Sequence, residues 1–162
     1  NDIFVIKNSK YEIELFKDYF VAPNLLSNIK TNNRVLNVVG SIFAQENNYQ
    51  NCLILNTNRN VIEALNGNVF LLKDGIVKTP PLSDGCLKGV LREQVIKIIS
   101  DLDHYSVQEV TISPFELQKA DEIFITNVIQ GINSVTRYRK KTYSDDLARE
   151  LINLLNTKIR IP

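Results

Sequence analysis

The stretch Leu26–Thr31 reads Leu-Ser-Asn-Ile-Lys-Thr, and three further short motifs follow it in a fixed order. These are Val61–Glu63 running into Asn68–Phe70, then Leu87–Arg92, then Ala120–Asn127. Each motif alone is weak. Together they supply a lysine, a carboxylate, a helix N-terminus that suits a phosphate group, and a backbone loop.

Length and composition indicate an ordinary globular domain. The chain has 162 residues, enough for one domain with a real core, and it is 44% hydrophobic and 23% charged. Nineteen basic residues nearly balance eighteen acidic ones, so net charge gives no reason to expect nucleic acid or a membrane as a partner. The uninterrupted apolar runs are too short to span a membrane, and no signal peptide is visible.

The cysteines and the histidine predict neither a metal site nor a disulfide. Cys52 and Cys86 lack the spacing of a metal or redox motif, which favours a reducing, cytoplasmic location. His104 stands alone in a turn rich in Asp, where we expect a surface side chain. The basic run Arg137–Lys141 is interpreted as a solvated strand end, not as a nucleic-acid patch.

Hydrophobic periodicity predicts a mixed α+β fold with hairpins local in the sequence. An apolar stripe runs along 31–47, and Asn32 or Asn33 could cap that helix. Ser113–Glu116 has the sequence of a capping box with Pro at the first helical position. The expected strands are 11–16, 52–56, 61–64, 68–72, 76–78, 122–126 and 132–138, and the expected helices are 31–47, 89–100, 113–120 and 144–155.

The order and spacing of the four motifs resemble the class IV (fold-type IV) aminotransferases, which depend on pyridoxal 5'-phosphate (PLP). Branched-chain aminotransferases, D-amino-acid transaminases and 4-amino-4-deoxychorismate lyases belong to that family. The resemblance runs from about Ala22 to Lys140. It implies that residues 1–162 form the C-terminal large domain of the D-amino-acid aminotransferase-like fold, a barrel-like sheet with flanking helices.

The resemblance also implies what surrounds this domain in an intact enzyme. The chain starts at Asn1 and contains no Met, so a smaller N-terminal domain is expected to be absent from it. The family's active site lies between the two domains, near the interface of a homodimer. We therefore expect an exposed apolar face and weak PLP binding by this chain alone.

Lys30 is the expected catalytic residue and binds the cofactor by forming an imine with its aldehyde, which requires the free amine. Without the resemblance, a lysine before a helix would be interpreted as a solvated charge. The resemblance makes Glu63 the partner of the pyridine nitrogen, where a carboxylate keeps the ring protonated and a better electron sink. Asn68 is expected to hold the turn near the ring; the alternative for Glu63 is a surface glutamate on a strand.

Gly89, Val90 and Leu91 begin a helix, whose free N–H groups and positive dipole end form a natural phosphate seat. Aminotransferases of the family usually carry Thr at the position of Leu91. The resemblance therefore implies that the phosphate would rest here on the Val90 and Leu91 amides and on an arginine of the absent N-terminal domain. Arg92 is interpreted as structural. The alternative is a plain helix start after a turn.

Two features are similar to the lyases of the family. Asn127, Val128 and Ile129 replace a Gly-Thr-Ala loop, and the resemblance makes them substrate-binding, with the Ile129 amide as the candidate for a carboxylate and Val128 beside it. Arg34 completes a Lys-x-x-Asn-Arg pattern, and Val35 stands where branched-chain aminotransferases place a tyrosine.

The resemblance therefore implies a PLP-dependent lyase that converts 4-amino-4-deoxychorismate to 4-aminobenzoate and pyruvate in folate synthesis. Lys30 would form the imine, take the proton from the carbon that bears the amine, and return a proton to pyruvate. Two alternatives stay open. One is transamination of a branched-chain or D-amino acid, and the other is a degenerate, non-catalytic domain kept for association.

Overall fold

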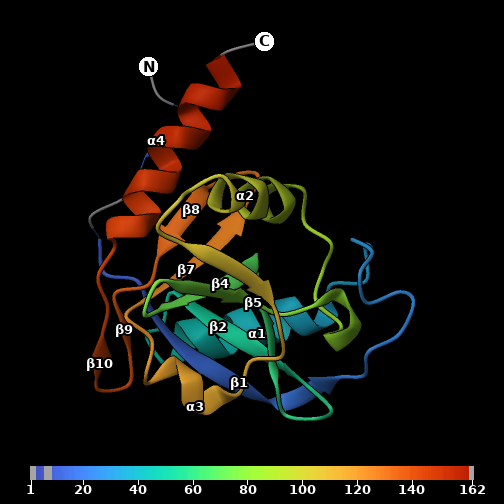
Figure 1. The fold of residues 1–162 in the computed structure, drawn as a ribbon. Coiled ribbons are helices and arrows are strands. Elements are labelled where there is room, and N and C mark those ends of the chain that lie inside the picture. Colours follow the sequence, from blue (N-terminus) through green and yellow to red (C-terminus); the bar gives the residue numbers. More distant parts are fainter. Residues whose placement is uncertain (1–2, 6–8, 161–162) are drawn as a thin grey trace.

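The computed structural model describes residues 3–5 and 9–160, which form two five-stranded sheets and the helices that cover them (Figure 1). The first sheet has the order β10-β9-β1-β2-β3 and the second β6-β5-β4-β7-β8. The first contains β10 (Lys141–Thr142), β9 (Arg137–Tyr138), β1 (Glu12–Val21), β2 (Asn51–Asn56) and β3 (Val61–Ala64). The second contains β6 (Ser106–Glu109), β5 (Ile76–Thr79), β4 (Asn68–Lys73), β7 (Glu122–Asn127) and β8 (Gly131–Ser134). The helices are α1 (Val35–Glu46), η1 (Leu82–Asp84), α2 (Val90–Ser100), α3 (Pro114–Leu117) and α4 (Asp146–Arg160).

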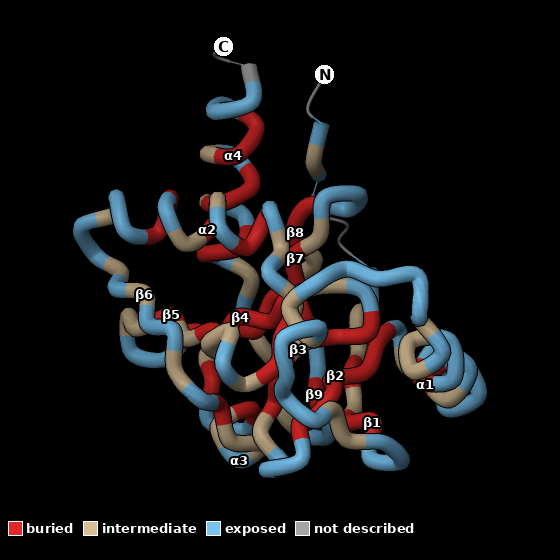
Figure 2. The backbone as a smooth tube through the Cα atoms, turned by 90° about the vertical axis from the view of Figure 1, so that its right-hand side faces the viewer, coloured by how far each residue is buried: buried red, intermediate tan, exposed pale blue. Residues whose placement is uncertain are grey.

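Alternation along the strands divides the interior into three hydrophobic clusters. In β2, Leu53 and Leu55 face the cluster between the two sheets, whereas Cys52 and Ile54 face the cluster beneath α1. In β4, which belongs to the second sheet, Phe70 lies on the face of that sheet that α2 and α4 cover, and it packs with those helices. The central strands β2, β4 and β7 are consequently buried on both faces (Figure 2).

The turn between β3 and β4 brings the two sheets together. Ala64 and Gly67 form a bridge across that turn, and Val61 bridges to Ile112. A Cβ atom at Gly67 would lie 2.5 Å from the Thr126 carbonyl oxygen, so only glycine allows this approach. The expectation of an α+β fold with a barrel-like sheet and flanking helices is confirmed.

Helix α1 begins later than predicted. It starts at Val35, not near Thr31, and neither Asn32 nor Asn33 caps it: Arg34 precedes the helix without a side-chain cap. The reason is a contact between distant segments, because backbone and side-chain bonds of Asn28 tie the preceding loop to the segment before α2. The final helix, by contrast, continues to Arg160, beyond the expected end at 155.

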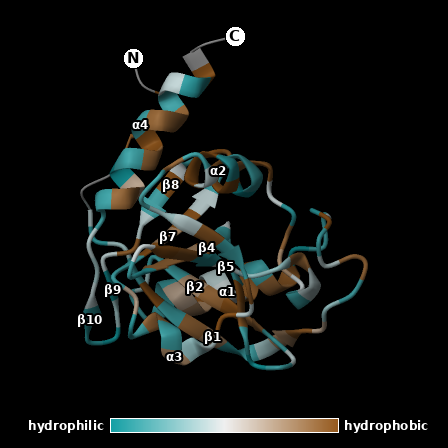
Figure 3. Cartoon of the chain, in the orientation of Figure 1, coloured by the Kyte–Doolittle hydropathy of each residue, from teal (hydrophilic) through white to brown (hydrophobic). Residues whose placement is uncertain are grey.

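The apolar stripe of α1 faces outward over much of its length. Val35, Val38, Val39 and Ile42 are hydrophobic but exposed; Figure 3 shows the hydropathy of α1 and of the rest of the chain. The buried side consists of Gly40 and Ala44, with Leu36 and Phe43 partly buried. An exposed apolar face of the kind expected is therefore present on α1.

Three strand predictions differ from the structure. Strand β1 is longer than expected, because an irregular register between Phe16 and Phe20 lets it continue to Val21. The predicted strand 132–138 is split into β8 and β9, which belong to different sheets. The change of sheet occurs where the Val135 N–H donates to Ile123 and the Thr136 N–H donates to Tyr11. Strand β6 was not expected, because its sequence Ser-Val-Gln-Glu is mostly polar at the sheet edge.

Other local predictions are confirmed. Ser113 and Glu116 form the capping box of α3, although the helix ends at Leu117 instead of near Ala120. Helix α2 spans the expected residues. Its first residue, Val90, is exposed. Cys52 and Cys86 are buried free thiols, and His104 is 69% exposed. Among the described residues, no helix is both long and apolar enough to cross a membrane.

A buried carboxylate fixes the start of α4. Glu122, on β7, accepts hydrogen bonds from the Leu147 N–H at 3.0 Å and the Ala148 N–H at 2.7 Å. Burial raises the pKa of Glu122 to about 7, although these two donors favour the charged form. The side chain thus replaces the missing partners of the first helical turn.

We predict that Glu122→Ala lowers the free energy of unfolding by about 2–4 kcal/mol, because two buried N–H groups lose their acceptor. The folded state holds the Glu122 proton more tightly than the unfolded chain, so this group makes stability fall as the pH rises from about 4.5 to about 7. Denaturant unfolding at several pH values measures both effects.

Glu93→Ala is the matched control, since it removes an exposed glutamate whose pair with Lys97 lies on the surface of α2. It is expected to change stability by less than about 0.5 kcal/mol. A Glu122→Ala protein as stable as this control, or one with the same pH dependence as the wild type, would contradict the assignment.

Candidate active site

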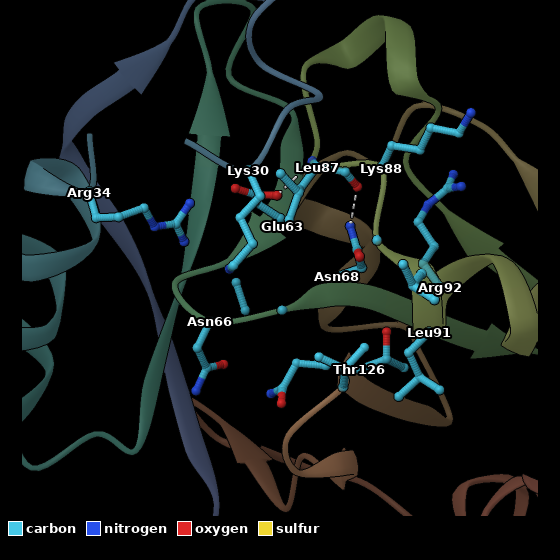
Figure 4. A pocket seen from close by; sticks show the side chains of 16 residues that line it. Lys30, Arg34, Glu63, Asn66, Asn68, Leu87, Lys88, Leu91, Arg92 and Thr126 are labelled. Atoms are coloured by element: carbon cyan, nitrogen blue, oxygen red, sulfur yellow. Dashed lines mark hydrogen bonds between the residues drawn. The ribbon is translucent and has the colours of Figure 1, made fainter. Parts of the chain in front are cut away.

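A pocket of about 190 Å³ lies where α2 begins, bordered by the turn between β3 and β4 and by the end of β7 (Figure 4). The side chains of Lys30 and Glu63 lie in the same part of the pocket, where the positive charge of Lys30 acts on the Glu63 carboxylate. The structure brings eight of the nine predicted site residues to this pocket: Lys30, Glu63, Asn68, Gly89, Val90, Leu91, Asn127 and Val128. Ile129 does not line it, and its side chain is 88% exposed.

The backbone of Leu87 holds two of these side chains in place. Its N–H donates to Glu63 Oε2 at 2.8 Å, and its carbonyl oxygen accepts from Asn68 Nδ2 at 2.7 Å. Glu63 lies on β3, whereas Asn68 begins β4. One peptide segment therefore orients side chains from both sides of the turn that joins the two sheets.

Asn28 attaches the loop of Lys30 to the same segment. Its side-chain amide donates to the carbonyl oxygens of Leu82 at 2.9 Å and Cys86 at 2.7 Å, and its own carbonyl accepts from the Lys88 N–H at 3.1 Å. These three bonds join residues more than fifty positions apart. They place Lys30, two residues later, at the pocket without any helical structure of its own.

Glu63 keeps one carboxylate oxygen available. Oε2 accepts from Leu87, while Oε1 has no hydrogen-bond partner among the described residues. Burial raises the pKa of Glu63 to about 7, and the Leu87 N–H, Arg34 and Lys30 each oppose that rise. A carboxylate in this environment is suited to accept a hydrogen bond from a protonated ring nitrogen. The shared proton offsets the free-energy cost of burying the charged carboxylate.

The N-terminus of α2 forms the other end of the pocket. Gly89 precedes the helix, so the N–H groups of its first turn have no carbonyl partner within the helix. A Cβ atom at Gly89 would lie 2.1 Å from Asn68 Oδ1, which explains why this position requires glycine. Thr126 also lines the pocket, and its buried Oγ1 has no hydrogen-bond partner.

The turn after β7 uses two of its backbone amides in internal hydrogen bonds. Asn127 Oδ1 accepts from the Ile129 N–H at 3.1 Å and the Gln130 N–H at 2.8 Å. The Ile129 amide, predicted to hold a substrate carboxylate, is thus bonded to Asn127 in this conformation. The Val128 N–H has no partner among the described residues, and Val128 lines the pocket.

Several residues at the pocket were not among the predicted site residues. Arg34 and Lys88 line it as additional cations, and Thr126 contributes its unpaired hydroxyl. The sequence motifs include all three residues, and Arg34 completes the Lys-x-x-Asn-Arg pattern, but their place at the pocket depends on contacts between distant segments. Arg92 also borders the pocket, but its guanidinium donates to Pro80 O and Glu109 Oε2, in agreement with its structural interpretation.

The donor set fits PLP. Glu63 Oε1 is available for the ring nitrogen, the amides of α2 and the unpaired Thr126 hydroxyl for the phosphate, and Lys30 for the aldehyde. Within residues 3–5 and 9–160, no group of three or more His, Cys, Asp or Glu side chains is arranged to hold a metal ion.

Comparison with known proteins agrees with this geometry. The model of the family described as "Amino-transferase class IV" matches residues 7–138. Branched-chain-amino-acid aminotransferase 6 of Arabidopsis thaliana is 38% identical over 88 residues, which are 52% of this chain and 24% of that protein. The chain spans less than half the length of this relative and of two other curated branched-chain aminotransferases.

Two solved structures share the fold. One, from Legionella pneumophila, carries the name "Putative 4-amino-4-deoxychorismate lyase"; it is 26% identical, with a TM-score of 0.86 over 95% of this chain and 58% of that chain. The other is an aminotransferase from Brucella abortus bound to PLP, 24% identical, with a TM-score of 0.82 over 94% of this chain and 55% of that chain.

Enzymes of this family depend on PLP, and the cofactor expected from the motifs is confirmed at the level of the family. The match to its model covers most of the sequence. The chain belongs to the class IV aminotransferase family.

Proposed function

We propose that residues 1–162 are the PLP-binding large domain of a lyase that converts 4-amino-4-deoxychorismate to 4-aminobenzoate and pyruvate, a step of folate synthesis. The observation that carries the proposal is the convergence of Lys30, Glu63 and the α2 N-terminus on one pocket. The intact enzyme would add a smaller N-terminal domain and a second subunit. Two buried free thiols favour a reducing compartment such as the cytoplasm.

Each residue has a task that its surroundings support. Bound PLP supplies an aldehyde that reacts with amines and a ring that accepts electrons from the carbon bearing the amine. Lys30 would hold the cofactor and then take a proton from that carbon. Glu63 would keep the ring nitrogen protonated through its available Oε1. Asn68 would position the site without touching the substrate, because it donates a hydrogen bond to the Leu87 carbonyl and lies against Gly89.

The phosphate would rest on the amides of Val90 and Leu91 at the start of α2. Leu91 has no hydroxyl and packs its side chain into the core with α2 and α4. The buried hydroxyl of Thr126, near the end of β7, would supply the missing donor. On the substrate side, Asn127, Val128 and Ile129 would hold a carboxylate, with the unpaired Val128 N–H as the available amide and Ile129 bonded to Asn127 until substrate displaces it.

The choice of a lyase rests on sequence at three positions and on one structural likeness. Val35 lacks the hydroxyl of a tyrosine, Leu91 that of a threonine, and Asn127 begins a lyase-like loop. The Legionella structure named as a lyase covers almost the whole chain. The second candidate, an aminotransferase, is favoured by the curated relatives, which are branched-chain aminotransferases.

The pocket of this chain alone is small and open. Its volume of about 190 Å³ is below the ~300–1,000 Å³ of typical small-molecule sites, and Lys30, Lys88, Val90 and Val128 are exposed at its border. A covering domain would enlarge the binding surface and exclude water from Lys30. We therefore expect weak PLP binding by residues 1–162 in isolation.

We predict that borohydride reduction of the PLP-loaded intact protein attaches the cofactor to Lys30 and that Lys30→Ala abolishes both the attachment and the visible absorbance. Activity should fall by at least about 10²-fold, because the proton-transfer group is lost with the attachment point. Peptide mass spectrometry identifies the modified lysine. Lys119→Ala, which removes an exposed lysine near α3, is the control and should label normally; label on Lys88 in place of Lys30 would refute the assignment.

Product analysis separates the two candidate reactions. The intact enzyme given 4-amino-4-deoxychorismate should release 4-aminobenzoate and pyruvate in equal amounts, without a 2-oxo acid acceptor. Chromatography of both products measures this ratio. Rapid amino transfer from branched-chain or D-amino acids to 2-oxoglutarate, with no 4-aminobenzoate formed, would replace the lyase assignment by that of an aminotransferase.

Asn28→Ala should weaken PLP binding and slow the attachment to Lys30 by about tenfold, since the loop of Lys30 loses two side-chain bonds to the segment before α2. Asn28 is a positioning residue, so the visible absorbance at saturating PLP should return to its normal wavelength. Spectral titration with PLP measures the affinity.

Asn24→Ala is the matched control, because the bonds of Asn24 stay within its own turn. If the two variants bind PLP equally well, the loop of Lys30 is not held by Asn28 in the way described.

A further inference from the structure

Arg34 borders the pocket from the start of α1. It is the residue that precedes the first turn of that helix, and its side chain is half-buried. Figure 4 shows its guanidinium directed toward Lys30 and Glu63. A half-buried guanidinium that faces a pocket is a strong, directional site for a carboxylate, because its N–H donors match the two oxygens.

The guanidinium of Arg34 has no ion-pair partner among the described residues around the pocket. Four cations line it, Lys30, Arg34, Lys88 and Arg92, against the single acid Glu63. Arg92 is paired with Glu109 at 2.7 Å, and Lys88 is exposed and directed outward in Figure 4. Within the described residues Arg34 has neither an ion pair nor a hydrogen bond, so its charge is available to a ligand.

Position separates Arg34 from the phosphate seat. The N-terminus of α2 and Arg92 lie at one side of the pocket, Arg34 lies at the other, and Glu63 and Asn68 stand between them (Figure 4). A phosphate bound at Gly89–Leu91 leaves the guanidinium free. The pocket therefore offers two anion sites, and the cofactor accounts for only one of them.

We propose that Arg34 is a specificity-determining residue that binds a carboxylate of the substrate, on the side of the pocket opposite the α2 N-terminus. This inference rests on the proposed function, because it assigns the second anion site to the substrate of the same pocket. It selects substrates that carry an acid group there over neutral analogues of equal shape.

A purely electrostatic role is the competing explanation. Arg34 opposes the burial-induced rise in the pKa of Glu63 more strongly than Lys30 does, so its only task could be to keep Glu63 ionised. The two roles differ in the ligands whose binding they affect. A tuning role affects every ligand and the cofactor alike, whereas a carboxylate-binding role affects acids and spares their amides.

The test compares 4-aminobenzoate with 4-aminobenzamide, which differ only in the acid group. Titration calorimetry on the PLP-loaded intact protein should show tighter binding of the acid. Arg34→Gln should weaken binding of 4-aminobenzoate by about 10–100-fold and that of 4-aminobenzamide by less than about twofold. Arg34→Lys should recover part of the preference, since it keeps the charge without the planar fork.

Two controls make the outcome decisive. Lys119→Gln removes one exposed positive charge elsewhere and should leave the preference intact. The affinity of Arg34→Gln for PLP, followed by absorbance, should match the wild type. Equal weakening of the acid, the amide and PLP would overturn the proposal in favour of the tuning role, and an unchanged preference would overturn it outright.

Failure of this proposal is distinguishable from failure of the proposed function. Labelling of Lys30 by PLP tests the cofactor site without reference to Arg34. The acid-against-amide titration is made on the PLP-loaded protein, in which the cofactor occupies the phosphate seat and leaves Arg34 as the second anion site. A wild type that labels Lys30 but shows no acid preference keeps the enzyme assignment and rejects the role of Arg34.

Discussion

The hydrogen bonds of the Leu87 peptide are the constraint on which the site depends. Its N–H is held by Glu63 and its carbonyl by Asn68, while Lys88, the next residue, donates to Asn28. Each bond contributes only about 1 kcal/mol net, but leaving a buried partner unpaired costs about 1–3 kcal/mol. The strand of Glu63, the strand of Asn68 and the loop of Lys30 therefore share one arrangement and cannot shift independently.

Glycine makes that arrangement sterically possible. The turn at Gly67 lies against the backbone of β7, and Gly89 lies against the side chain of Asn68. The contact of Gly67 lies where the first sheet meets the second, and the contact of Gly89 lies where α2 meets the second sheet. The pocket is thus formed by close backbone contacts, with functional side chains at its border, and not by a cleft between bulky residues.

The sequence allows the fold and most of the site to be predicted, because these depend on local signals. Alternation identifies the central strands. The resemblance of the four motifs to the family indicates which lysine, carboxylate and helix start belong together. Contacts between distant segments were beyond it. The pattern Lys-x-x-Asn-Arg includes Arg34, but it does not show that this side chain faces the pocket. Spacing also does not reveal the unpaired Thr126 hydroxyl, the cap that Glu122 gives α4 or the bond that occupies the Ile129 amide. The late start of α1 has the same origin, since Asn28 bonds to residues far along the chain.

The pairing of β1 with β9 has a consequence for how the chain folds. These strands run parallel, and Glu12 and Arg137, which form an ion pair across them, are 125 positions apart. Contacts of such high sequence separation must overcome a large loop-closure entropy before they contribute, which slows folding. During synthesis the first sheet stays incomplete, with an edge of β1 unpaired, until β9 and β10 have left the ribosome.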